Sequence, residues 1–229
     1  DLGITGPGGV AFWPAAVIPA IFAVLFGPWT GGIGAAIGIF VRDMLFHGEP
    51  LLSLSAGVTA NFAGFFLLGY ISTKNLDWKK IIISVAFSSV LVVSSFLVPM
   101  ALPLESGGVS KISPSDAILL FFAAVAGSLL LIVAIAHFWP EWKNYGVSSV
   151  IGLGVGATII SIAVWMYSQL FFSPYLGGPL QSTLIPVIFV WTFASEIPFI
   201  ILLGPPVIKA CYRAFPSLKP SQQPETKEK

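Results

Sequence analysis

Charged residues are scarce in this chain. Only 9% of its 229 residues are Asp, Glu, Lys or Arg, whereas a soluble domain carries about 25%. The net charge is +1, so there is no basic excess to neutralise the phosphates of a nucleic acid. Low charge combined with 56% apolar residues excludes a soluble globular enzyme and a disordered chain. The composition indicates a polytopic membrane protein.

Cysteine and histidine are also rare. The single cysteine, Cys211, excludes an internal disulfide and a cysteine-ligated zinc site. The two histidines, His47 and His137, are expected near opposite faces of the membrane, which argues against a shared metal or haem. The sequence contains no HExxH, GxSxG or P-loop motif. We therefore expect a protein that is not an enzyme and that holds no cofactor and no metal.

Long apolar runs dominate what is present. A helix needs about 20 apolar residues to cross a bilayer, and turn residues divide the chain into about seven such runs. The runs lie at about 10–27, 31–47, 51–72, 79–102, 115–138, 147–172 and 181–208. We expect an all-α, polytopic transmembrane helical bundle over residues 10–208. An extracellular segment at 1–9 precedes it, and a basic, polar, disordered cytoplasmic tail at 209–229 follows it.

Lys and Arg predict the orientation, because cytoplasmic loops are enriched in them. With the C-terminus in the cytoplasm, nine basic residues lie inside and two outside. The nine are Lys74, Lys79, Lys80, Lys143, Lys209, Arg213, Lys219, Lys227 and Lys229, and the two are Arg42 and Lys111. We expect a multi-pass protein of the cell membrane with residue 1 outside. Residue 1 is Asp rather than Met, so we expect that a first helix could precede it. Such a helix would return the N-terminus to the cytoplasm.

The most informative polar cluster ends the run at 31–47. Arg42 and Asp43 fall about one helical turn inside the expected interface, where charge is costly unless it is paired or hydrated. With His47 they either hold a polar ligand from the outer side or pair with their neighbours as an ordinary interfacial cluster. Asn61, near mid-membrane, either binds the same ligand or fastens two helices together.

Two further features stand inside the expected spans. Glu196 is the one acid in the last run, and a buried intramembrane acid is a candidate functional residue. Its expected depth, in the cytoplasmic half, favours coupling or helix clasping over binding at the outer face. Small residues four apart let helices approach closely, either within the bundle or against a partner. These pairs are Ala16 and Ala20, Gly27 and Gly31, Gly34 and Gly38, and Gly152 and Gly156.

Several short motifs resemble one transporter family. The stretch from Pro19 to Gly32, with Phe26-Gly27-Pro28 and then Gly31, leads through a glycine-rich run to Arg42-Asp43. It resembles the second and third helices of the substrate-binding S components of energy-coupling factor (ECF) transporters. The run Ala60-Asn61-Phe62-Ala63-Gly64 is similar to one in riboflavin-type members, and Glu196-Ile197-Pro198 resembles part of the last helix. Family members usually have six helices, whereas this sequence shows about seven apolar runs.

The resemblance implies uptake of a vitamin or similar micronutrient. The S component captures the substrate from outside, while a transmembrane coupling subunit and cytoplasmic ATPases supply the energy. By topology and motif position, we expect the substrate-binding residues to be Trp13, Arg42, Asp43, His47, Asn61 and Gln181. We expect coupling or helix packing at Gly27, Pro28, Gly31, Gly34, Gly38 and Glu196. The alternative, a non-catalytic structural subunit of a larger membrane complex, explains the apolar composition and the close-packing glycines equally well.

Overall fold

The computed structural model describes residues 6–10, 13–74 and 137–218, together with scattered residues between 119 and 135. Within these residues, helices are the only regular secondary structure, which confirms the all-α class for this part of the chain. The main helices are α1 (Val17–Phe26), α2 (Pro28–Phe46), α3 (Pro50–Leu52), α4 (Thr59–Ser72), α7 (Lys143–Leu170) and α8 (Leu184–Ala214). Short 3₁₀ turns are η1 (Pro7–Gly9), η2 (Pro14–Ala16), η4 (Pro140–Trp142) and η5 (Pro216–Leu218).

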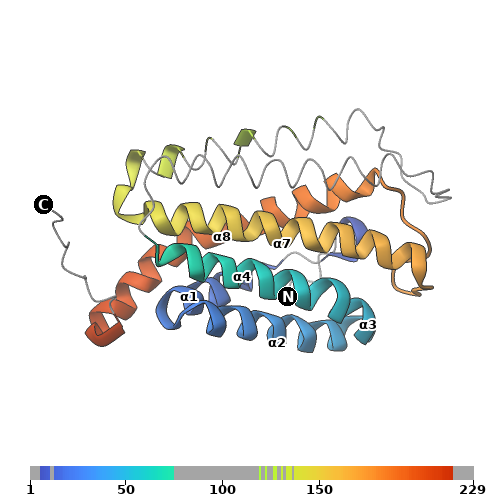
Figure 1. The fold of residues 1–229 in the computed structure, drawn as a ribbon, viewed down its shortest axis with the longest axis horizontal. Coiled ribbons are helices and arrows are strands. Elements are labelled where there is room, and N and C mark those ends of the chain that lie inside the picture. Colours follow the sequence, from blue (N-terminus) through green and yellow to red (C-terminus); the bar gives the residue numbers. More distant parts are fainter. Residues whose placement is uncertain are drawn as a thin grey trace, which may run out of the picture.

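A π-helical turn, η3 (Ser53–Val58), joins α3 to α4, so that Pro50–Ser72 is one continuous helix. The chain runs back and forth through α2, helix Pro50–Ser72, α7 and α8, each antiparallel to the one before it (Figure 1). One end of the bundle therefore holds the end of α2, the start of helix Pro50–Ser72 and the loop between α7 and α8. We call this end the pocket end.

Three described helices are long and apolar enough to cross a membrane: Pro50–Ser72, Pro140–Leu170 and Leu184–Ala214. They correspond to the expected runs at 51–72, 147–172 and 181–208. The run at 10–27 forms a shorter apolar helix, Pro14–Phe26. The run at 31–47 forms α2, whose glycines and Arg42-Asp43 pair lower its hydropathy. The run at 79–102 lies outside the described residues, as does most of the run at 115–138 and the tail beyond residue 218.

The turn between α1 and α2 follows from two adjacent residues. Gly27 takes a φ of +94°, which residues other than glycine rarely adopt, and Pro28 occupies the first position of α2. The hairpin closes tightly because Gly31 lies directly against Ala23 of α1. Gly34 and Gly38, by contrast, have no described atom within 4 Å of an added Cβ. The expected packing role thus holds within the described bundle for Gly31, while Gly34 and Gly38 face away from it.

Helices α4 and α7 pack with their backbones in contact. A Cβ added at Gly152 would lie 2.5 Å from the carbonyl oxygen of Gly64, and one at Gly156 would lie 3.2 Å from that of Ala60. Only glycine allows this approach, as expected for small residues between membrane helices. Of the two roles left open for small residues four apart, Gly152 and Gly156 pack within the bundle. Gly64 and Gly156, which take part in this contact, also line the pocket described below.

Candidate functional site

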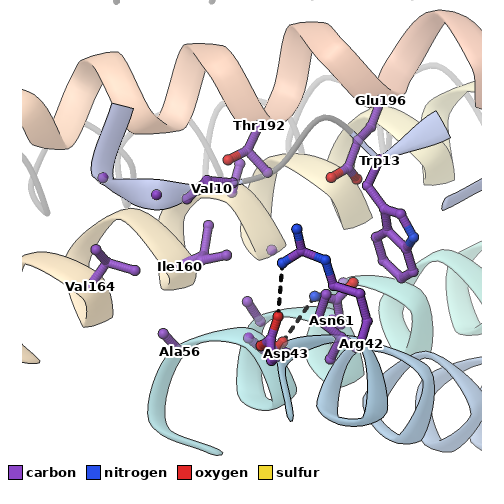
Figure 2. A pocket seen from close by; sticks show the side chains of 18 of the residues that line it. Val10, Trp13, Arg42, Asp43, Ala56, Asn61, Ile160, Val164, Thr192 and Glu196 are labelled. Atoms are coloured by element: carbon purple, nitrogen blue, oxygen red, sulfur yellow. Dashed lines mark hydrogen bonds and ion pairs between the residues drawn. The ribbon is translucent and has the colours of Figure 1, made fainter. Parts of the chain in front are cut away.

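A pocket opens between the helices, with walls from the N-terminal turn, α2, helix Pro50–Ser72, α7 and α8 (Figure 2). It holds about 860 Å³ of space free of protein atoms, part of it open to the exterior. Most of its wall is apolar. Its polar side chains are Arg42, Asp43, His47, Asn61, Tyr175, Thr192 and Glu196. A largely apolar pocket with a few convergent polar groups is the usual form of a small-molecule site.

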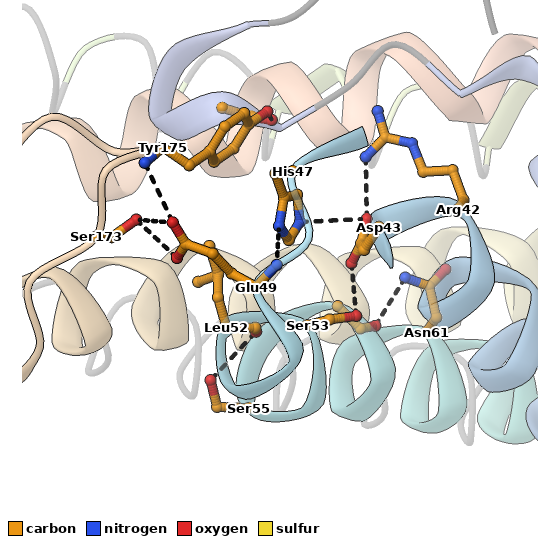
Figure 3. Close-up of polar contacts among 12 residues, drawn as sticks. Arg42, Asp43, His47, Glu49, Leu52, Ser53, Ser55, Asn61, Ser173 and Tyr175 are labelled. Atoms are coloured by element: carbon orange, nitrogen blue, oxygen red, sulfur yellow. Dashed lines mark hydrogen bonds and ion pairs between the residues drawn. The ribbon is translucent and has the colours of Figure 1, made fainter. Parts of the chain in front are cut away.

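Asp43 is the centre of the polar cluster (Figure 3). It is only 6% exposed. Its Oδ1 lies 3.0 Å from Nη1 of Arg42 and 3.7 Å from Nε2 of His47, and its Oδ2 accepts a 2.7 Å hydrogen bond from Oγ of Ser53. These partners offset the cost of burying the charge of this carboxylate. The cluster therefore holds α2 against the first turns of helix Pro50–Ser72.

The π-helical turn brings backbone close to this carboxylate. A Cβ added at Gly57 would lie 2.7 Å from Oδ2 of Asp43, so glycine is required at this contact. One turn further on, Nδ2 of Asn61 donates a 2.9 Å hydrogen bond to the carbonyl oxygen of Gly57. This bond orients the Asn61 amide, and its side chain lines the pocket. Isolated π-helical turns occur frequently at functional sites.

The loop between α7 and α8 is fastened to the pocket end through Glu49. The Glu49 carboxylate accepts hydrogen bonds from Oγ of Ser173, at 2.8 and 3.0 Å, and from the backbone N–H of Tyr175 at 3.1 Å. Nδ1 of His47 accepts a 3.1 Å hydrogen bond from the Glu49 N–H, which places the proton of the neutral ring on Nε2, facing Asp43. The His47 and Tyr175 rings lie 4.7 Å apart. Loop, histidine and Asp43 therefore form one connected network.

Tyr175 also holds the N-terminal turn over the pocket. Its hydroxyl donates a 2.6 Å hydrogen bond to the carbonyl oxygen of Gly9, and Nε1 of Trp191 donates a 3.0 Å bond to that of Val10. Burial raises the pKa of the Tyr175 hydroxyl, and the nearby charges modify this effect, with Arg42 lowering the pKa and the Asp43 and Glu49 carboxylates raising it. The hydroxyl therefore stays protonated and can donate to Gly9 over the whole neutral range.

Glu196 lies in the same pocket, on the wall formed by α8. It is 6% exposed, and its carboxylate points into the space between Arg42 and Trp13 (Figure 2). This position differs from the expected one, in which Glu196 lay at a different depth from the Arg42 cluster. The reason is the length of α8, which has 31 residues and continues to Ala214. Glu196 thus belongs to the half of α8 nearer the pocket end.

The structure brings most of the expected binding residues together. Trp13, Arg42, Asp43, His47 and Asn61 all line the pocket, whereas Gln181 is not among the lining residues. The sequence analysis missed Thr192, which lies one turn before Glu196 on the same face of α8. The four-residue spacing between them could have indicated that Thr192 faces the same pocket as Glu196. The N-terminal turn at residues 8–10, which carries only glycine and valine into the wall, was missed as well.

Nothing among the described residues points to a metal centre, since no group of three or more His, Cys, Asp or Glu side chains is clustered there. In comparisons with known proteins, no family model, no curated protein and no solved structure matches the chain.

Proposed function

We propose that this chain is the substrate-capture component of a small-molecule uptake system in the cell membrane, of the ECF transporter type. The observation that supports it most is the pocket, in which Arg42, Asp43, Asn61 and Glu196 converge within a bundle of apolar helices. Polar and charged groups inside a membrane protein are costly, and they generally mark the path or the binding site of a substrate.

The direction of capture follows from the orientation predicted by Lys and Arg. With the C-terminus in the cytoplasm, the pocket end faces outward. The N-terminal turn and the loop carrying Ser173 and Tyr175 then cover the pocket on the outer side, where the polar contacts of Glu49 and Tyr175 hold them. A substrate would enter between these two covers and leave towards the cytoplasm after the component reorients.

The energy for uptake would come from partners. The sequence has no P-loop, so we assign ATP hydrolysis to cytoplasmic ATPases that act through a transmembrane coupling subunit. The outer face of α2 is our candidate docking surface for that subunit. There, Gly34 and Gly38 leave the helix backbone open, and Ile33, Ile37 and Val41 are exposed beside them. Small residues allow a partner helix to approach closely.

Native mass spectrometry of the protein, released gently from its own membrane, tests this proposal. A capture component should carry a molecule of vitamin-like mass, and the variants Asp43→Ala and Asn61→Ala should lose it. The variant Glu141→Gln, which changes an exposed acid outside the pocket, should retain it.

The same experiment separates the alternative function. A structural subunit would release large membrane proteins in fixed stoichiometry, with no small molecule and no ATPase among them. That result would contradict the transport proposal.

A further inference from the structure

Three acids lie around the pocket end, and they differ in what they bind. Asp43 is paired with Arg42 and accepts a hydrogen bond from Ser53, and Glu49 accepts hydrogen bonds from Ser173 and Tyr175. Glu196 is as buried as Asp43, at 6% exposure. Yet it has no hydrogen bond or ion pair with any residue in the part of the chain that the structure describes. The carboxylates of Asp43 and Glu49 are therefore bonded to other residues of the protein, whereas the carboxyl group of Glu196 faces the pocket.

The titratable groups on the described pocket walls are not all paired with one another. Arg42 and Asp43 form an ion pair at 3.0 Å and neutralise each other, and His47 accepts a hydrogen bond at Nδ1, as a neutral ring does. Glu196 adds a carboxyl group with no countercharge among the described wall residues, so its ionised form gives the wall one negative charge in excess. An uncompensated carboxylate in an apolar wall is costly. A ligand with a positive charge removes that cost, whereas an anionic ligand increases it.

The pocket wall also contains an aromatic side chain. The Trp13 indole lines the same pocket as Glu196 (Figure 2). The indole ring is the side chain that attracts organic cations most strongly. Further along the pocket, the wall becomes apolar, with Ala157, Ile160 and Val164 of α7. The pocket thus offers one carboxylate and one aromatic face at one side, and room for an apolar body at the other.

We propose that the pocket selects a small organic cation, an amine or amidine attached to an apolar or aromatic body, and that Glu196 binds its charged nitrogen. The inference rests on the proposed capture function and names the chemical class of the captured molecule. The Glu196 carboxylate accepts hydrogen bonds from the cationic N–H groups, Trp13 covers the charge, and the body of the ligand lies against α7. Arg42 remains paired with Asp43 and shapes the wall.

Three probes of one shape and different charge test this assignment. Benzamidine is cationic, benzamide is neutral and benzoate is anionic, on the same planar skeleton. Their binding to the full chain in lipid nanodiscs is measured by calorimetry and by quenching of tryptophan fluorescence. Benzamidine should bind at least tenfold more tightly than benzamide, and benzoate should bind most weakly. The variant Glu196→Gln, which keeps the shape and removes the charge, should abolish the preference for benzamidine and leave benzamide affinity unchanged.

Controls separate the charge of Glu196 from the general stability of the bundle. Glu141→Gln makes the same chemical change outside the pocket and should leave the tenfold preference intact. Trp13→Phe should weaken benzamidine binding severalfold without reversing the preference, because phenylalanine attracts cations less strongly than tryptophan. Both variants, and Glu196→Gln, are compared with the parent protein in thermal unfolding, so that a misfolded variant is recognised.

Several outcomes would overturn the assignment. Equal binding of benzamidine and benzamide, tighter binding of benzoate, or no binding of benzamidine would each do so. In a further outcome, sodium chloride stabilises the protein against unfolding more than potassium chloride does, only when Glu196 is present, and benzamidine does not bind. That outcome would assign the carboxylate to an inorganic cation instead. These results leave the capture function standing if a small molecule still co-purifies with the protein. If nothing co-purifies and benzamidine binding does not depend on Glu196, both proposals fail.

Discussion

Oδ2 of Asp43 accepts a 2.7 Å hydrogen bond from Oγ of Ser53, and this bond joins the last turn of α2 to the π-helical turn of the next helix. Both residues are buried. Because Asp43 also contacts Arg42 and His47, the bond connects the charged cluster to the helix that carries Asn61. The shape of the pocket wall therefore depends on it.

The variant Ser53→Ala should destabilise the protein by about 1–3 kcal/mol, because a buried acceptor loses its partner. Ser55→Ala is the matched control. Its hydroxyl is exposed and donates only to the backbone of its own helix, at Leu51 and Leu52. Thermal and denaturant unfolding in detergent measure the stability of both variants. Equal stability of the two variants would show that the Asp43–Ser53 bond contributes nothing.

The contact between α4 and α7 predicts a sharp difference between two neighbouring glycines. Gly152→Ala places a methyl group 2.5 Å from the carbonyl oxygen of Gly64 and should force the helices apart, at a cost of about 1–3 kcal/mol. Gly154→Ala, on the same helix with no described atom within 4 Å, should be neutral or stabilising by up to about 1 kcal/mol. The unfolding midpoints of the two variants are compared with that of the parent protein. A loss of stability in Gly154→Ala as large as in Gly152→Ala would contradict the packing shown here.

The bond from Tyr175 to Gly9 predicts local mobility of the N-terminal turn. Tyr175→Phe removes the 2.6 Å hydrogen bond and should raise the free energy of the closed turn by about 0.5–1.5 kcal/mol. Hydrogen–deuterium exchange of peptides covering residues 6–13 should become severalfold faster, while peptides from α7 stay unchanged. Tyr70→Phe, on the opposite end of helix Pro50–Ser72, serves as control. Unchanged exchange at residues 6–13 would mean that Tyr175 does not hold the turn.

The single cysteine makes the orientation testable. With a cytoplasmic C-terminus, a membrane-impermeant maleimide should not label Cys211 in intact cells and should label it after permeabilisation. The variant Pro179→Cys in a Cys211→Ser background should be labelled in both cases, because Pro179 is exposed in the loop at the pocket end. Labelling of Cys211 in intact cells would reverse the orientation and turn the pocket towards the cytoplasm.

Local features of the sequence were sufficient to predict where several of the described helices lie, including the three that are long and apolar enough to cross a membrane. The expected run at 51–72 agrees with helix Pro50–Ser72, since Pro50 starts the helix and Lys74 follows the end of the apolar run. The expected break between the runs at 10–27 and 31–47 agrees with the turn at Gly27-Pro28, because those two residues favour one backbone geometry. Arg42, Asp43 and His47 were recognised because charge at the end of an apolar run stands out.

The position of Glu196 could not be predicted in this way. Its depth was estimated from the apolar run at 181–208, but α8 begins at Leu184 and continues through Lys209 and Arg213 to Ala214. Charged residues near a helix end do not stop the helix, because their long side chains reach the interface. The helix is therefore longer than its apolar run, and Glu196 lies nearer the pocket end than the run suggested.

The sequence by itself determined a membrane-protein composition, the positions of the described apolar helices and a polar cluster at the end of α2, because each depends on residues close together in the chain. Only the tertiary structure decided which of those residues share a pocket. The packing of α8 places Glu196 and Thr192 in the same pocket as Asp43 and Asn61, and the glycine contact brings the backbones of α4 and α7 together at the pocket wall. Both result from packing between helices far apart in the chain, which local apolar patterns do not encode.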